Sequence, residues 1–392
     1  ERGASRAWEE PRWPPRGIWL TNPVNYLGLD AIDLAAVDST LERFVRTQQD
    51  CGQGAGDHGR CLWEEVLTHT RSGKRLRSRL VVLAAQVGER GPSAATADAV
   101  AAVAAVYGLL HAAFILHDDV IDRDDMRYGR PSLHASHAAG ARSRGMSGES
   151  AIHRGYSRSI LAGDLALAAA YRLLLAGTAE VQAPEREQLQ RILHDTVVST
   201  TLGELLDVEL ALAPASGDVG PADLRSEALR TAELKTAVYT FQAPLMSGAL
   251  LAGLETEQVQ AVGRIGTQLG MAYQLEDDLQ GVFGDQESTG KPVGGDLREG
   301  KHTYLMASAL MSPRAAEARE LLARSAVATD ADLAGITVSM RELLTRCGAL
   351  DATSEQIRRH AHQAQQQIGP AQLPDPLGST LRRLAEEIGA PR

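Results

Sequence analysis

The stretch AVAAVAAVYGLLHAAFILHDDVIDRDD, Ala99 to Asp125, decides the fold class. Its first part, Ala99–Leu116, carries no charge and is rich in Ala and Leu, which favour helix. Its length is near the lower limit for a membrane span, but the segment contains His111 and runs directly into a cluster of aspartates. We therefore interpret it as the buried central helix of a bundle and expect no integral membrane span.

The rest of the chain also favours helices. Of its 392 residues 44% are apolar and only 4% are aromatic, and helical periodicity dominates from about Leu29 onward without a convincing alternating strand. The charged, Pro-rich residues 1–28 are expected to form an irregular N-terminal extension. We predict an all-α protein in which residues 29–392 form one catalytic domain, a single large helical bundle with a central active-site cavity.

Charge and cysteine usage narrow the class of protein. The net charge of -10 does not suggest the basic face of a nucleic-acid-binding protein, so we expect no nucleic-acid partner. The three cysteines, Cys51, Cys61 and Cys347, are too few and too scattered for a disulfide framework or a zinc site. No signal-peptide pattern is present in the opening residues. These features are typical of a cytoplasmic protein whose cysteines stay reduced.

The first acidic motif is HDDVIDRDD, His117 to Asp125. On a helix Asp118 and Asp122 lie one turn apart on one face, with Asp119 beside them. Like charges at this spacing repel each other, so the motif favours a bound cation. Carboxylates are ligands that suit Mg²⁺, an ion that also keeps waters and binds substrate phosphates.

A second acidic motif, YQLEDDLQGVFGD, runs from Tyr273 to Asp285 and places Asp277 and Asp278 at the end of an apolar helix. Two such helix ends in one chain indicate magnesium ions that hold a diphosphate from both sides. Loss of that diphosphate from an allylic carbon leaves a carbocation, which requires an apolar, dry pocket. The uncharged helix before Asp118 supplies a suitable wall.

Basic residues accompany the acids. Lys74 and Arg77 are three residues apart and share a helical face, Lys235 opens the segment KTAVYTF, and Lys291 and Lys301 flank the end of a Gly-rich, charged segment that we interpret as a lid. Together these cations suit a substrate with several phosphate oxygens.

Several motifs in order resemble the trans-polyprenyl diphosphate synthase family, especially its bacterial geranylgeranyl-type branch. They are SGKRLR (72–77), HAAFILHDDVID (111–122), ILAGDLA (160–166), GELLDVEL (203–210), KTAVYTF (235–241), YQLEDDLQGVFGD (273–285) and TGKPVGGDLREGKHT (289–303). The resemblance implies the isoprenoid synthase fold, a homodimer, and a site that holds about three Mg²⁺ ions.

The resemblance also implies residue roles. The metal-binding residues would be Asp118, Asp119, Asp122, Asp207, Asp277 and Asp278. The allylic substrate or its diphosphate would contact Arg127, Lys235, Thr236, Gln274, Lys291 and Lys301. The diphosphate of the partner, isopentenyl diphosphate, would contact Lys74, Arg77, His111 and the residue at position 128. The residues expected to carry the chemistry are Asp118, Asp119, Lys235 and Asp277.

Departures from the family pattern concentrate near the partner site. Tyr128 stands where a second arginine is usual. Its hydroxyl can form one hydrogen bond, but it lacks the charged guanidinium with which an arginine binds a phosphate through two hydrogen bonds. The usual Gly-Gln pair is Gly203-Glu204, which adds a negative charge near the allylic pocket. The usual GGKRLRP is SGKRLRS, and Gly281 replaces the last acid of the second motif.

These observations lead to a principal function and two alternatives. The principal prediction is a Mg²⁺-dependent transferase that condenses an allylic prenyl diphosphate with isopentenyl diphosphate. Side chains one or two helical turns before Asp118 would set the product at about C15 to C20. The first alternative is a terpene cyclase on the same scaffold that ionises a prenyl diphosphate without isopentenyl diphosphate, a reading motivated by Tyr128 and Glu204. The second is a non-catalytic partner subunit, against which the two acidic motifs argue.

Overall fold

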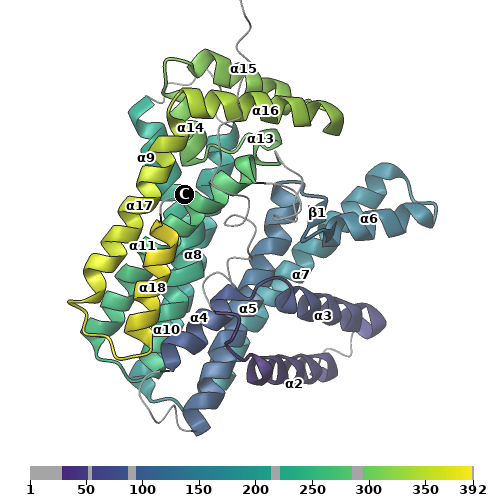
Figure 1. Ribbon diagram of the computed structural model, residues 1–392. Coiled ribbons are helices and arrows are strands. Elements are labelled where there is room, and N and C mark those ends of the chain that lie inside the picture. The colour runs from purple at the N-terminus through teal and green to yellow at the C-terminus, as the bar shows by residue number, and fades with distance from the viewer. Residues whose placement is uncertain (1–28, 52–54, 87–93, 213–220, 285–294, 391–392) are drawn as a thin grey trace, which may run out of the picture.

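The computed structural model describes residues 29–51, 55–86, 94–212, 221–284 and 295–390, and nearly all regular structure in these ranges is helical (Figure 1). The predicted extension, residues 1–28, lies outside them, so the domain boundary stays a prediction. The elements, in chain order, are α2 (Ala35–Cys51), α3 (Gly56–Arg71), α4 (Leu76–Ala85), α5 (Ala94–Ile121), β1 (Met126–Arg127), β2 (Arg130–Pro131), α6 (Leu133–Ser143), α7 (Gly148–Gly177), α8 (Ala183–Leu212), α9 (Pro221–Ala232), η2 (Glu233–Gln242), α10 (Ala243–Leu251), α11 (Thr256–Phe283), α13 (Gly295–Arg298), α14 (Tyr304–Leu310), α15 (Ala315–Ser325), α16 (Asp330–Arg346), α17 (Ala349–Ile368) and α18 (Leu377–Gly389).

Helix α5 is the central helix that the sequence predicted. All side chains from Ala99 to Leu110 are buried, because the Ala-rich surface lets α7 and α4 approach closely. Tyr107 is fully enclosed and its hydroxyl lies 2.9 Å from Oγ of Ser247 on α10. Burial weakens again towards the carboxyl end of α5, where the acidic motif begins.

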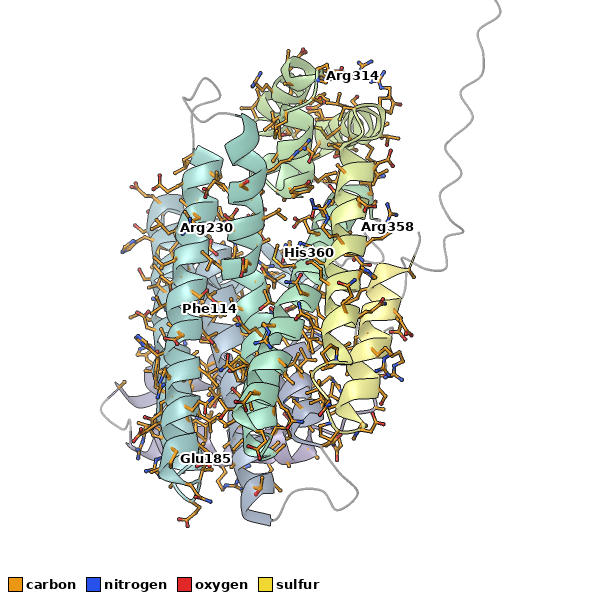
Figure 2. All side chains as sticks on the ribbon, turned by 90° about the vertical axis from the view of Figure 1, so that its left-hand side faces the viewer. Phe114, Glu185, Arg230, Arg314, Arg358 and His360 are labelled. Carbon is orange, nitrogen blue, oxygen red and sulfur yellow. The ribbon has the colours of Figure 1, made fainter. Side chains whose placement is uncertain are left out.

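The second half of the bundle is organised around α11, which packs against η2 and α17. Figure 2 shows the long helices running side by side, with Arg358 and His360 on α17. Nδ1 of His360 lies 2.7 Å from Oε1 of Gln268 on α11. Gly270 permits a close approach of α11 to η2, because a Cβ there would lie 2.7 Å from Cα of Ala237. All-α architecture is therefore confirmed in the described residues.

Within the part of the chain that the structure describes, two helices are long and apolar enough to cross a membrane by length and composition alone. The first, Thr96–Ile121, has 83% of its apolar window buried inside the protein, as expected for a core helix. The second, Gly148–Gly177, has only 39% buried. Packing inside the protein therefore leaves several large apolar side chains of this helix exposed.

Candidate active site

The first acidic motif lies at the carboxyl end of α5 and is held by Arg127. Nε of Arg127 donates to Oδ1 of Asp119 at 2.6 Å, and its Nη2 lies 3.2 Å from Oδ2 of Asp118 and 3.1 Å from Oδ2 of Asp124. Asp119 is fully buried, and burial raises its pKa to about 6 despite the opposing charge of Arg127. Arg127 thus orients the motif from outside the helix.

A tight turn aims Arg127 at these acids. Met126–Arg127 pairs antiparallel with Arg130–Pro131, and the two residues between them, Tyr128 and Gly129, have φ of 52° and 72°. Positive φ at both central positions matches the twist of a two-residue hairpin, and glycine adopts it without strain. The hairpin projects Arg127 and Tyr128 from consecutive positions.

Lys235 joins three carboxylates from two helices. Its Nζ lies 2.6 Å from Oδ2 of Asp207, 2.9 Å from Oε2 of Glu204 and 3.3 Å from Oδ1 of Asp118. These anions outweigh burial and raise the pKa of Lys235 well above its usual range, so the lysine is charged. Gly203 makes the geometry possible, because a Cβ there would collide with the backbone of Lys235.

The winding of η2 is unusual. The segment Glu233–Gln242 forms a π-helix, a rare conformation that is frequent at functional sites. It directs Lys235 towards the acids, while Tyr239 and Thr240 contact Arg77. Thr236 follows Lys235 on the same segment.

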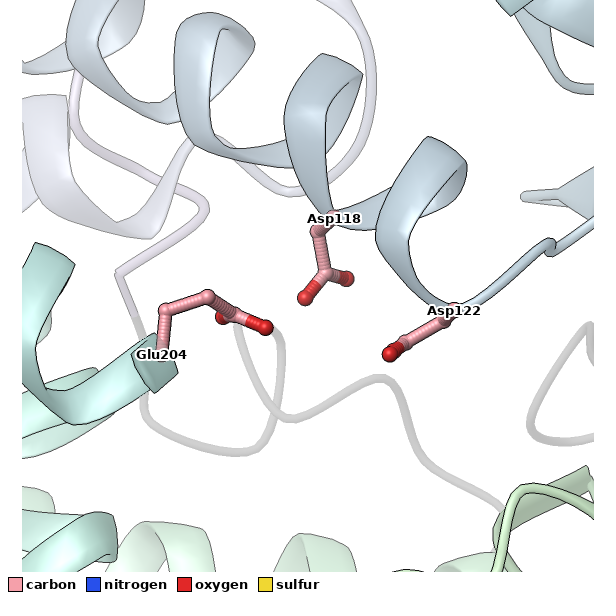
Figure 3. A group of neighbouring side chains, drawn as sticks. All are labelled: Asp118, Asp122 and Glu204. Atoms are coloured by element: carbon pink, nitrogen blue, oxygen red, sulfur yellow. The ribbon is translucent and has the colours of Figure 1, made fainter. Parts of the chain in front are cut away.

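Three carboxylates converge on one space between α5 and α8. One oxygen from each of Asp118, Asp122 and Glu204 lies within 4.8 Å of the others, and Figure 3 shows the three side chains pointing towards one another. Burial and the charges of Asp118 and Asp122 raise the pKa of Glu204 to about 7 against the opposing effect of Lys235. This crowding of like charges indicates a place for additional positive charge.

Lys301 closes the far side of the cluster. Its Nζ lies 2.7 Å from Oδ2 of Asp122 and 2.7 Å from Oε2 of Glu299, whose pKa is raised to about 8 by burial. Counted over the described residues, three cations (Arg127, Lys235 and Lys301) pair with seven carboxylates. The carboxylates are Asp118, Asp119, Asp122, Asp124, Glu204, Asp207 and Glu299.

This donor set fits hard divalent cations. All the crowded ligand atoms are carboxylate oxygens, which Mg²⁺ prefers, and the acids outnumber the paired cations. Oδ2 of Asp119 and Oε1 of Glu204 are buried and have no hydrogen-bond donor among the described residues. The acidic cluster could therefore hold a metal ion.

The second acidic motif lies near the carboxyl end of α11. Asp278 is buried and accepts a hydrogen bond from Nε2 of Gln274 at 2.7 Å, whereas Asp277 is exposed. The charge of Asp277 partly offsets the burial that lowers the pKa of Lys74, so the two side chains are electrostatic neighbours. Asp277 and Asp278 do not join the cluster of Asp118 in this structure.

A polar group next to the first motif contains two of the residues expected to bind isopentenyl diphosphate. Nη2 of Arg77 donates to the hydroxyl of Tyr239 at 2.6 Å and to Oγ1 of Thr240 at 2.8 Å, and its Nη1 lies 3.4 Å from Nε2 of His111. Burial and the charge of Arg77 lower the pKa of His111 well below its usual range, so this histidine is neutral.

The structure brings together Asp118, Asp119, Asp122, Asp207, Arg127, Lys235 and Lys301 through ion pairs and close carboxylates, and it places Arg77, His111 and Tyr128 in a second group. Asp277 and Asp278 do not join the acidic cluster, and Lys291 lies outside the described residues. Sequence reasoning missed Glu204 as a member of the acidic cluster and noted it only as a departure. It also missed Tyr239 and Thr240, although both belong to the quoted segment KTAVYTF. The signal was present, but the partner of these two side chains, Arg77, lies far away in the sequence.

Known proteins of similar sequence and structure define the class. The structure matches a geranylgeranyl pyrophosphate synthase from Corynebacterium glutamicum, solved with isoprenyl diphosphate and magnesium, with a TM-score of 0.79 and 28% identity over 92% of this chain and 100% of that chain. The fold is thus that of the isoprenoid synthases, and the chain is an enzyme that transfers prenyl groups.

Sequence similarity then identifies the family. Residues 62–336 match polyprenyl synthetase, and the chain belongs to this family. It is 30% identical to a geranylfarnesyl diphosphate synthase of Aeropyrum pernix over 74% of this chain and 81% of that protein. It is 31% identical to a nonaprenyl diphosphate synthase of Mycobacterium tuberculosis over 88% and 90% of the two chains. These relatives give the terpene cyclase alternative no support.

Proposed function

We propose that this enzyme condenses an allylic prenyl diphosphate with isopentenyl diphosphate and releases inorganic diphosphate. A new C–C bond replaces the allylic C–O bond, and the proton lost from the isopentenyl unit passes to the released diphosphate. The observation that carries this proposal is the convergence of Asp118, Asp122 and Glu204 beside Lys235, next to a separate cationic group around Arg77.

Each side chain has a definable task on the allylic side. Bound Mg²⁺ ions would neutralise the leaving diphosphate as the C–O bond breaks, and the family resemblance implies about three of them. Lys235 and Lys301 are fixed, charged donors for its oxygens. Arg127 orients Asp118 and Asp119 and binds the same diphosphate. Thr236, Gln274, Lys291, Asp207, Asp277 and Asp278 complete the proposed site.

The isopentenyl side is less charged than the family pattern implies. Lys74 and Arg77 supply the positive charge, while neutral His111 and Tyr128 supply hydrogen bonds. The hydroxyl of Tyr128 can donate to one phosphate oxygen, where an arginine would offer a fork. We infer that isopentenyl diphosphate is used but bound weakly.

The apolar wall of α5 sets the product length in this proposal. Phe114 lies one helical turn before Asp118 and its ring meets that of Tyr239 edge-on, with centroids 5.2 Å apart. The growing chain meets this pair early, which favours a product of about C15 to C20. The relatives named above differ in their products, so the length is a property of this chain's own side chains.

We also propose a cytoplasmic homodimer. Exposed large apolar side chains gather on α7 and α8, and they are Ile152, Ile160, Leu161, Leu175, Val198, Leu202, Leu205 and Leu212. Large apolar side chains exposed in this number on two helices favour a protein interface over a surface that faces only water. A dimer face accounts for the low burial of α7 without a membrane.

The direct assay follows incorporation of radiolabelled isopentenyl diphosphate. With dimethylallyl, geranyl or farnesyl diphosphate and Mg²⁺, we expect an elongated labelled prenyl diphosphate, and Asp118→Asn should lower the rate about a hundredfold or more. Absence of an elongated product with every primer would reject the proposal. Formation of a hydrocarbon from an allylic diphosphate alone would favour a cyclase instead.

A further inference from the structure

Glu204 stands out from the other acids because it brings a third carboxylate to the pair that α5 provides. It comes from α8, and one of its two oxygens lies within 4.8 Å of one oxygen each of Asp118 and Asp122 (Figure 3). The residue that is usual at this position is an uncharged glutamine. A glutamine could accept from Lys235 as Glu204 does, but would add no charge.

The two oxygens of Glu204 have different surroundings. Oε2 lies 2.9 Å from Nζ of Lys235, so the lysine holds the side chain in place. Oε1 is buried and has no hydrogen-bond donor among the described residues. A buried carboxylate oxygen without a donor is costly, and a cation would satisfy it.

The number of carboxylates affects when a cation binds. Mg²⁺ is usually held by one or two carboxylates together with substrate phosphates, so its site is completed only by the substrate. A third carboxylate from the protein supplies a ligand that the phosphate would otherwise provide. Site charge and ligand number both raise the affinity for divalent cations.

We propose that Glu204 is a third protein ligand, with Asp118 and Asp122, for a divalent cation, and that this chain consequently binds that cation before any diphosphate arrives. The inference rests on the proposed function only in assigning the acidic cluster to divalent ions. Metal binding to the substrate-free protein is measured separately from prenyl transfer, so either proposal can fail without the other.

The test uses Mn²⁺, which takes the same oxygen ligands and is detected by electron paramagnetic resonance. The full-length, substrate-free protein is titrated with Mn²⁺, and free Mn²⁺ is measured from its signal. We expect saturable binding to the wild type and an affinity about tenfold or more lower in Glu204→Gln. Asp125→Asn is the matched control, because it removes one charge from the same region, on a side chain 82% exposed.

Two outcomes overturn the proposal directly. The first is a wild type that binds no Mn²⁺ without diphosphate, and the second is a Glu204→Gln variant that binds Mn²⁺ as well as the wild type and the Asp125→Asn control. Circular dichroism confirms that each variant is folded, and the near-isosteric Gln keeps the contact with Lys235.

A second pair of variants separates a ligand from a residue that only positions Lys235. In a Lys235→Met variant, Glu204 no longer has a lysine as its partner. If Glu204 is a ligand, adding Glu204→Gln to this background still lowers Mn²⁺ affinity about tenfold. If the effect of Glu204→Gln vanishes there, Glu204 acts through Lys235 and the proposal is wrong.

Discussion

The hydroxyl of Tyr128 lies 3.4 Å from Nε2 of His111. The Tyr128 ring also covers Gly73, where a Cβ would meet its Cζ at 3.0 Å. The tyrosine therefore lies beside His111 and belongs to the polar group that contains Arg77 and His111. Under the proposed function, we expect Tyr128 to weaken the binding of isopentenyl diphosphate, because it stands in this group without a positive charge.

Tyr128→Arg is expected to lower the KM for isopentenyl diphosphate about tenfold or more, because a charged hydrogen bond contributes roughly 1.5–3 kcal/mol. The KM for the allylic primer should change little. Steady-state kinetics with each substrate varied in turn measure both. Tyr128→Phe is the control, since it removes only the hydroxyl and should not lower either KM. An unchanged or raised KM for isopentenyl diphosphate in Tyr128→Arg would contradict the assignment.

Phe114 is expected to limit the product. Phe114→Ala removes the ring that meets Tyr239, so the chain can grow along α5 by at least one further isoprene unit. Mass spectrometry of the products, made with the same primer, measures this. Phe114→Trp should shorten the product or leave it unchanged. If the alanine variant gives the wild-type product, another side chain limits the length.

The exposed apolar surface of α7 and α8 predicts the oligomeric state. Leu161 and Leu202 are 57% and 49% exposed, and changing both to Glu would place charges in a dimer interface. We expect a dimer for the wild type and a monomer for the double variant, by light scattering after size-exclusion chromatography without detergent. Val327→Glu, at a side chain 85% exposed outside this surface, should stay dimeric. A monomeric wild type would disprove the interface.

Glu65 is expected to stabilise the junction of α3, α6 and α7. It accepts from Nε and Nη2 of Arg158 at 2.8 and 2.9 Å and pairs with Nε2 of His137 at 2.9 Å. Burial would raise its pKa, but the hydrogen bonds from His137 and Arg158 outweigh burial and lower it. A lowered folded-state pKa means that the stabilisation is present above the unfolded pKa and is lost as the pH falls through the folded one.

Glu65→Gln should therefore reduce the free energy of unfolding by roughly 1–3 kcal/mol at neutral pH. The difference from the wild type should shrink as the pH falls below about 4. Urea unfolding followed over pH measures it, and Glu64→Gln, at the exposed neighbouring position, is the matched control. A difference that stays constant down to low pH would show that the carboxylate charge is not involved.

Local patterns predicted the parts of the site that lie within one helix. The uncharged segment before Asp118 had to be buried, and Asp118 and Asp122 had to share a face, because both follow from helical periodicity. Glu204 could not be assigned to them, because its position depends on how α8 packs against η2 at Gly203. The π-helical winding that turns Tyr239 towards Arg77 likewise has no signature in residue spacing.

The central claim is that carboxylates from two separate segments of the chain share divalent ions with one diphosphate. Crystals grown with Mn²⁺ and an unreactive allylic thiolodiphosphate test it most directly, since Mn²⁺ is located by anomalous diffraction. We predict Mn²⁺ bound both to Asp118 and Asp122 and to Asp277, with the diphosphate bridging these ions beside Lys235. Mn²⁺ at only one of the two acidic motifs, or a diphosphate bound without any metal ion, would contradict the account.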